Sequence, residues 1–278
     1  MKVTSSAILY LCLLLPSCAG KFDNDLFDAV SRNDIGSVDH MLHKGGVDVN
    51  KKDTEGRTPL FLAAWLGQKD IVHLLIKNGA DPEAKNRFGE TPLLIVATKG
   101  YIETARVLVE NNANVNAVNT DSITPLMYSA TYGFPEIVSL LLERQAAVNA
   151  VSKEKLTPLV YACLNNHIDV ARLLIAQKAD VNFDLQDHET ILMLLATKGY
   201  AEMAQLLIDN GAQVNVKTTY QSTALMAACR NRHADVVKVL IAAKADLNAK
   251  DENGETALDH AQRAGAQDIV MLLQQQKK

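Results

Sequence analysis

The chain has 278 residues, with 32 acidic residues against 28 Lys and Arg, and a formal net charge of −4. This near balance excludes the strongly basic surface on which nucleic-acid binding and adsorption to acidic lipids depend. Hydrophobic residues make up 48% of the chain and aromatic residues only 5%, which favours a core of Leu, Ala, Val and Ile. No apolar run reaches the roughly 18 residues that a membrane-spanning helix needs.

Residues 1–20 have the pattern of a secretory signal peptide. Lys2 supplies a short charged start, residues 7–15 form an apolar segment, and small residues follow around Cys18. This order of charged, apolar and small residues is typical of export signals. We therefore expect an exported protein, in the periplasm or anchored to the outer membrane, with secretion as the alternative.

Two processing routes fit this segment. Residues 17–19 form a small-x-small site for ordinary cleavage after Ala19. Residues 15–18 also resemble a bacterial lipobox, in which Cys18 would become a lipid-bearing first residue. Pro16 departs from the residue types that are usual at its place in that motif. Lipidation of Cys18 would be the only expected contact with a membrane.

A period of 33 residues dominates the rest of the chain. A leucine recurs at this spacing as Leu60, Leu93, Leu126, Leu159, Leu192, Leu225 and Leu258. A threonine two places earlier recurs as Thr58, Thr91, Thr124, Thr157, Thr190, Thr223 and Thr256. A fixed period of this length predicts stacked structural units that bury one another's apolar faces.

Each unit is predicted to contain a polar turn and two short helices. Thr58 is expected to cap the first helix, Gly67 to end it, and Gly79 to close the second. Apolar residues stand at helical spacing as Leu60, Ala63 and Ala64 in the first helix and Ile71, Val72, Leu74 and Leu75 in the second. Helices of about ten residues are marginal alone in water, so neighbouring units must stabilise them.

The pattern G-x-T-P-L-x-x-A-x-x-x-G-x-x-x-I-V-x-x-L-L-x-x-G-A-D-x-N, spread over Gly56–Asn86 and its copies, resembles the ankyrin repeat. The resemblance covers the chain from about residue 22 to its C-terminus. It implies an all-α repeat solenoid of about eight units, each with a β-turn finger before its helix pair. We expect one ankyrin domain over residues 21–278. It comprises a degenerate first unit (21–53), full units (54–251) and a C-terminal cap unit (252–278).

The fingers are of two kinds. Units two, three and eight keep a glycine, as Gly56, Gly89 and Gly254, whereas units four to seven have Ser122, Lys155, His188 and Gln221 at that place. Side chains other than glycine's lose easy access to positive φ. The central fingers therefore either adopt another turn that presents side chains to a partner, or have drifted under weak constraint.

The sequence shows no sign of catalysis, and we expect no catalytic residue, cofactor or metal. Cys163 and Cys229 are two periods apart, which places them about 20 Å apart when units stack at the helix-packing distance of about 8–10 Å. A disulfide needs Cα atoms within about 7 Å, so two buried free thiols are predicted. The histidines are dispersed, and no nucleophile elbow, phosphate loop or H-E-x-x-H motif occurs.

The resemblance implies a protein partner, bound by finger tips and by the exposed face of the first helices along a concave groove. Trp, Tyr and Arg most often dominate binding energy in such interfaces. The expected partner-binding residues are Trp65, Leu66, Phe88, Tyr132, Leu164, Tyr220 and Arg230. Trp65 and Tyr132 have a second interpretation, in which they pack between units.

We expect a monomeric, non-catalytic interaction scaffold of the bacterial envelope. One alternative is a cytosolic or host-directed ankyrin protein that modulates a host partner. Another is an enzyme with a site between repeats, for which the sequence offers less, because its histidines and acids do not cluster along the chain.

Overall fold

A computed structural model describes residues 26–276 of the chain, so the expected signal peptide and Cys18 lie outside the described residues. These residues form 16 α-helices arranged as eight consecutive pairs. The first helices of the pairs are α1 (Leu26–Ser31), α3 (Pro59–Trp65), α5 (Pro92–Ala97), α7 (Pro125–Tyr132), α9 (Pro158–Leu164), α11 (Ile191–Lys198), α13 (Ala224–Arg230) and α15 (Ala257–Arg263). The second helices are α2 (Ile35–Lys44), α4 (Lys69–Lys77), α6 (Ile102–Glu110), α8 (Pro135–Glu143), α10 (Ile168–Ala176), α12 (Ala201–Asp209), α14 (Ala234–Ala242) and α16 (Gln267–Gln275).

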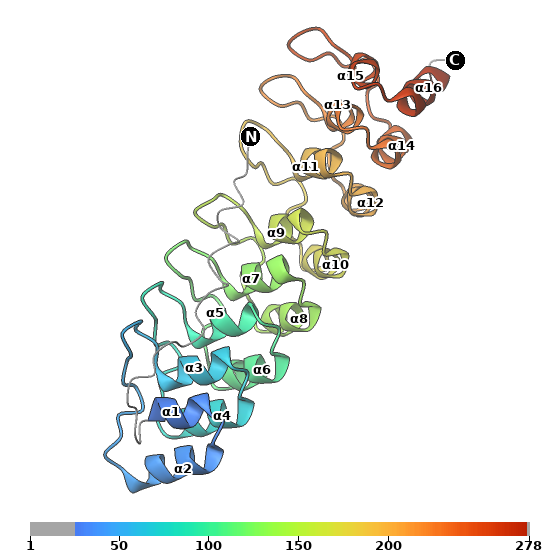
Figure 1. Cartoon of the computed structure of the whole chain (residues 1–278). Helices are drawn as coiled ribbons and strands as arrows, with labels where there is room; N and C mark the ends of the chain where they lie inside the picture. Colours follow the sequence, from blue (N-terminus) through green and yellow to red (C-terminus); the bar gives the residue numbers. More distant parts are fainter. Residues whose placement is uncertain (1–25, 277–278) are drawn as a thin grey trace.

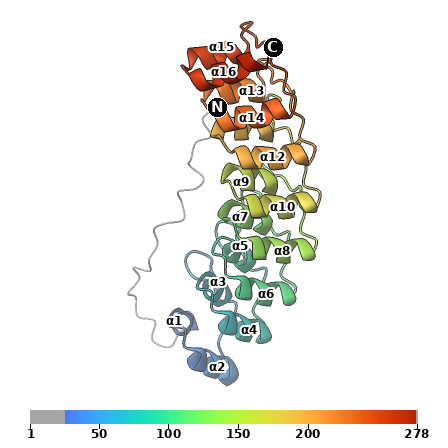
Figure 2. The same ribbon diagram turned by 90° about the vertical axis from the view of Figure 1, so that its right-hand side faces the viewer.

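The pairs stack in chain order into an elongated solenoid (Figure 1). Figure 1 shows the first helices in one row and the second helices in a parallel row beside it, and Figure 2 shows the two rows from another side for α3 to α10. The loops that enter the first helices project on one side as fingers (Figure 1). The all-α repeat solenoid predicted from the sequence is confirmed. Over residues 26–276, no helix combines the length and apolar character that crossing a bilayer requires.

Threonine caps begin the first helices as predicted. The hydroxyl oxygen of Thr58 accepts a hydrogen bond from the backbone N–H of Phe61 at 3.2 Å, and the other six period threonines do the same at 3.2 to 3.4 Å. Gly67 follows α3 in the left-handed region with φ 71°, where a residue without Cβ ends a helix at little cost. The local signals of the repeat therefore act within each unit.

The core runs without interruption along the stack. Leu60, Ala63, Ala64, Ile71 and Leu75 are all at most 1% exposed, and their counterparts in units three to seven are buried with them. Helix α2 buries only Val38 completely, because it lies at the end of the stack where no neighbour covers its outer side.

Backbone hydrogen bonds join neighbouring finger tips. The N–H groups of Arg87, Thr120, Lys153, Thr219 and Glu252 donate to the carbonyls of Glu55, Phe88, Asp121, Asp187 and Tyr220, respectively, at 3.0 or 3.1 Å. Over residues 26–276, the corresponding bond from Gln186 to the Glu154 carbonyl is absent. The ladder is therefore broken between the fingers of units five and six.

Three of the four fingers without glycine keep the glycine conformation. Ser122, Lys155 and Gln221 have φ of 59°, 62° and 57°, in the same left-handed region as Gly56 at 75°. Their polar side chains are tolerated there at a cost of about 1–2 kcal/mol each. For these three fingers, the hypothesis of another turn is wrong.

The finger of unit six does adopt another turn. Asp187 and His188 both have positive φ, of 54° and 59°, and the N–H of Glu189 donates to the Gln186 carbonyl at 2.8 Å. In unit two, Oδ1 of Asp53 accepts hydrogen bonds from the N–H groups of two finger residues at 2.8 and 2.9 Å. Leu185 stands at the corresponding place in unit six, and its side chain has no acceptor atom. The turn therefore shifts by one residue and resembles a two-residue hairpin loop.

Candidate functional site

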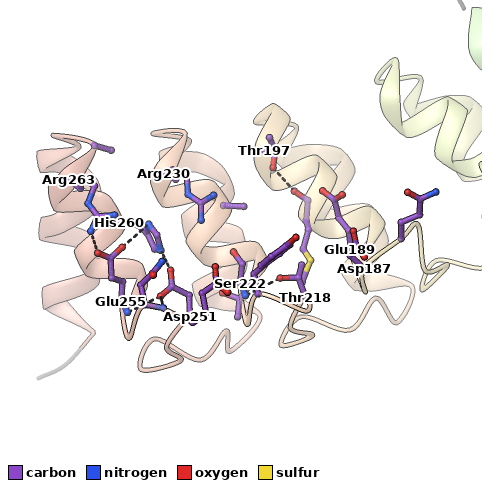
Figure 3. A pocket seen from close by; sticks show the side chains of 18 residues that line it. Asp187, Glu189, Thr197, Thr218, Ser222, Arg230, Asp251, Glu255, His260 and Arg263 are labelled. Atoms are coloured by element: carbon purple, nitrogen blue, oxygen red, sulfur yellow. Dashed lines mark hydrogen bonds and ion pairs between the residues drawn. The ribbon is translucent and has the colours of Figure 1, made fainter. Parts of the chain in front are cut away.

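A groove lies between the fingers of units six to eight and the first helices α11, α13 and α15. Its volume is about 680 Å³. The fingers supply Asp187, Tyr220 and Glu252, and the helices supply Arg230 and Arg263. Figure 3 shows the two arginines extending from the helix row toward the acidic finger side chains. Side chains from three consecutive units therefore face one open space.

The two walls of the groove differ in charge. Five carboxylates line the finger wall: Asp187, Glu189, Asp251, Glu252 and Glu255. The cations Arg230 and Arg263 come from the ends of α13 and α15 on the helix wall. Burial, together with the nearby charge of Asp187, raises the pKa of Glu189 above its usual value. The groove is therefore more favourable to a cation on its finger side than on its helix side.

A charge network with a buried Asp251–His260 pair closes the C-terminal end of the groove. Nε2 of His260 lies 2.9 Å from Oδ2 of Asp251, and Nδ1 lies 3.9 Å from Oε2 of Glu255. Arg263 forms an ion pair with the other oxygen of Glu255. The Glu255 Oε2 atom is buried without a hydrogen-bond partner. The four side chains alternate acid and base and tie the last finger to α15.

Asp251, Glu255 and His260 are also the three potential metal ligands that lie within 4.8 Å of one another among the described residues. The carboxylates face opposite nitrogens of one imidazole ring, so they do not surround a common point as metal ligands must. Glu255 already pairs with Arg263. The geometry fits an internal ion network better than a metal centre.

Of the residues predicted to bind a partner, Tyr220 and Arg230 line this groove together. Tyr220 is 59% exposed on the finger tip of unit seven. Phe88 and Leu66 are exposed elsewhere on the stack, and Leu164 is partly buried against the core. The structure therefore brings two of the seven predicted residues into one groove and distributes the others along the solenoid.

Trp65 and Tyr132 are half-buried at the ends of α3 and α7. The guanidinium carbon of Arg57 lies 5.7 Å from the centre of the Trp65 ring. The ring of Tyr132 stacks on that of Phe134, with centroids 6.3 Å apart. Each ring therefore packs against its own chain while leaving part of its surface accessible.

The prediction for the central cysteines is confirmed. Cys163 and Cys229 are free and buried. Burial raises the pKa of each thiol to about 12, so almost no thiolate forms near neutral pH. Neither cysteine has the chemistry of a nucleophile in the folded protein.

The sequence interpretation missed the charge network because its members, although close together between residues 251 and 263, match no known motif. The position of His260 within the repeat was nevertheless a signal for the network. His260 occupies the place that Tyr128 and Tyr161 hold in units four and five. The hydroxyl of Tyr128 accepts a hydrogen bond from Asn119 at 3.0 Å, and that of Tyr161 lies 3.2 Å from the Ser152 hydroxyl. This helix position reaches the base of its own finger in all three units.

Comparison with known proteins agrees with this architecture. The family model described as "Ankyrin repeats (3 copies)" matches residues 26–119, 60–152, 112–187, 175–251 and 192–278. A search of curated proteins found no match.

Two solved structures are similar over most of the chain. The ankyrin repeat domain of Bcl-3, described as a unique member of the IkappaB protein family, is 27% identical, with a TM-score of 0.71; the match covers 80% of this chain and 100% of that one. The human ASB11 ankyrin repeat domain is 25% identical, with a TM-score of 0.70; the match covers 78% of this chain and 98% of that one.

Proposed function

Because the chain belongs to the ankyrin repeat family, whose fold is a general protein–protein interaction scaffold, we propose that it is a non-catalytic scaffold that binds a protein partner. The proposed binding surface is the face formed by the fingers and the first helices, called the finger face below. The observation that carries this proposal is the groove of units six to eight, in which Tyr220 and Arg230 are accessible beside several carboxylates.

The finger face suits recognition because it is formed before a partner arrives. Backbone hydrogen bonds join five pairs of neighbouring finger tips, and the first helices beneath them belong to one continuous core. A surface that is already ordered loses little conformational entropy on association. Binding energy from exposed Tyr and Arg side chains is then available for affinity.

An enzymatic site between repeats has less support. The two central thiols are buried with raised pKa values, and His260 is only 6% exposed and engaged by Asp251. A general acid or base must reach the proton that it transfers. The groove residues that are accessible suit recognition instead.

We also propose that the protein is a monomer that is exported to the bacterial envelope. The proposed export rests on the charged, apolar and small residues of segment 1–20. Intact mass spectrometry of the mature protein tests this. Export predicts either a chain of residues 20–278 or a diacylated chain that begins at Cys18. A chain that retains Met1 would contradict export and favour the cytosolic alternative. Host-directed secretion would be recognised by recovery of the protein outside the bacterium.

The partner is best sought by crosslinking in the native envelope, followed by identification of the captured protein and measurement of its affinity with purified components. Replacing Phe88, Tyr220 and Arg230 together by alanine should weaken binding at least tenfold, because each side chain is exposed on the finger face. Met271→Ala is the matched control, since Met271 is 52% exposed on α16 in the second-helix row. Equal affinity of the triple variant and the control would overturn the finger face as the binding surface.

A further inference from the structure

An arginine of the chain itself is held at the finger tips of units two and three. A terminal nitrogen of Arg87, in the finger of unit three, lies 2.7 Å from Oε2 of Glu55 in the finger of unit two. The guanidinium carbon of Arg87 also lies 4.7 Å from the centre of the neighbouring Phe88 ring. One guanidinium is thus held between a carboxylate and an aromatic face.

The same positions recur four periods later without the cation. Glu55, Arg87 and Phe88 correspond to Asp187, Thr219 and Tyr220. The acid and the aromatic residue are retained, whereas threonine is neutral and too short to replace the arginine. The backbone hydrogen bond between the two finger tips is also retained, because the N–H of Thr219 donates to the Asp187 carbonyl at 3.0 Å, as that of Arg87 does to the Glu55 carbonyl at 3.0 Å. The turns themselves differ: Asp187 has φ 54° in the shifted turn of unit six, so its carboxylate leaves the backbone in a different direction from that of Glu55.

Further negative charge surrounds this second position. The finger of unit eight places Glu252 beside Tyr220, since the Glu252 N–H donates to the Tyr220 carbonyl at 3.1 Å. Glu189 lines the same groove. Among the described residues, no ion pair joins Asp187, Glu189 or Glu252 to a cation.

The cations of the groove itself come from the opposite wall. Arg263 is engaged by Glu255 in the ion network at the end of the stack. Arg230 is the last residue of α13, and its side chain extends toward the fingers (Figure 3). Neither stands at the finger-tip position that Arg87 holds in unit three.

We propose that the finger tips of units six and seven, with Glu252 of unit eight, form a subsite for an arginine side chain of the protein partner. The partner's guanidinium lies against the Tyr220 ring and the Asp187 carboxylate, where Arg87 lies against Phe88 and Glu55 at the other site. The inference rests on the proposed function, and it names the chemistry that the finger face recognises. An arginine is favoured over a lysine because its planar guanidinium can stack on an aromatic ring and pair with a carboxylate at the same time.

The test uses the full chain with ¹³C-labelled tyrosine and follows the ring signals by NMR, with the Tyr220 signal assigned from Tyr220→Phe. The probe is the peptide acetyl-Gly-Arg-Gly-amide, compared with the same peptide containing Lys or Gln. The arginine peptide should shift the Tyr220 signal saturably in the millimolar range, since single exposed ion pairs and cation–π contacts are weak. The lysine peptide should bind several-fold more weakly. An unshifted Tyr220 signal, or an equal shift with the glutamine peptide, overturns the proposal.

The two finger-tip sites supply matched variants. Thr219→Arg places the chain's own guanidinium in the subsite and should reduce arginine-peptide affinity at least tenfold, whereas Asp187→Asn should reduce it about threefold to fivefold. Arg87→Thr should do the reverse and make the Phe88 ring of labelled protein respond to the same peptide. A Thr219→Arg variant that binds the peptide as well as the parent chain would overturn the proposal.

Failure of this inference differs from failure of the proposed function. If the Phe88, Tyr220 and Arg230 variant loses the partner while the arginine peptide leaves Tyr220 unshifted, the finger face binds by other contacts and the arginine subsite is wrong. The opposite result is that the arginine peptide binds, that Asp187→Asn weakens peptide binding, and that neither Asp187→Asn nor the triple alanine variant changes the affinity for the partner. In that case the subsite stands and the proposed partner surface is wrong.

Discussion

Oδ2 of Asp251 and Nε2 of His260 lie 2.9 Å apart, and both side chains are only 6% exposed. This pair joins the finger of unit eight to α15, the first helix of the same unit. Oδ1 of Asp251 also accepts the N–H groups of Asn253 and Glu255, so the carboxylate orders the finger turn as well. In a solenoid, an end unit has only one neighbour to stabilise it, which makes such internal links important there.

His260→Ala should destabilise the folded chain by about 3 kcal/mol, because a buried carboxylate loses its partner. Arg263→Ala is the control: Arg263 is 65% exposed, and loss of an exposed pair costs at most about 1 kcal/mol. Urea denaturation measures both, and amide exchange should show α15 and α16 opening first in the His260 variant. Equal costs for the two variants would contradict the structural role assigned to the buried pair.

Glu83→Asn should stabilise the protein near neutral pH by about 0.5–1 kcal/mol. Glu83 accepts the N–H of Asn114 at 2.8 Å, where the neighbouring units have asparagines; Asn149, for instance, accepts the Asp180 N–H and also donates to the Lys178 carbonyl. Asparagine at position 83 would keep the accepted bond and add the donated one.

The gain from Glu83→Asn should depend on pH. Burial raises the pKa of Glu83 above its usual value, so the charged form is disfavoured in the folded state. This penalty is fully present above the folded pKa and disappears as pH falls below the unfolded pKa. Chemical denaturation at neutral pH and near pH 4 should therefore give a larger gain at neutral pH. A larger gain at the acidic value would contradict this account.

Gly133→Ala should cost roughly 3 kcal/mol, more than Gly211→Ala at about 1 kcal/mol. Both glycines have positive φ, of 74° and 89°, so both substitutions pay for left-handed backbone. A Cβ at Gly133 would lie 2.4 Å from Nδ1 of His167, whereas one at Gly211 would meet nothing within 4 Å. Displacing His167 would also break the contact between its Nε2 and the Thr131 carbonyl. Thermal unfolding of the two variants would show whether ring packing adds to backbone strain.

The amide of Gln186 should exchange with solvent much faster than those of Lys153 and Thr219. The latter two donate to the neighbouring finger tips at 3.0 Å, and the Gln186 bond is the missing member of that ladder. Native-state hydrogen exchange by NMR compares the three directly. Protection of Gln186 equal to that of the other two would show that the ladder is continuous in solution.

The amino-acid sequence was sufficient for the fold because the signals that build each unit act over short distances. Thr58 caps its helix through a bond three residues away, and Gly67 ends the same helix. The apolar residues at helical spacing then make consecutive units stack, since each unit can bury its apolar face only against the next. These caps, helix ends and apolar positions recur with the 33-residue period along the chain.

The candidate site depended on the stack itself. Leu185 lacks the side-chain acceptor that Asp53 supplies in unit two, and the finger turn of unit six shifts in response. The sequence indicated a change in the fingers of units four to seven but did not distinguish unit six from the other three. The burial of His260 between two carboxylates, and the groove shared by Asp187, Tyr220 and Arg230, depend on how adjacent fingers and helices are placed. Residues far apart in sequence acquire their charge environment and exposure only when the units pack, because those properties depend on neighbours in space.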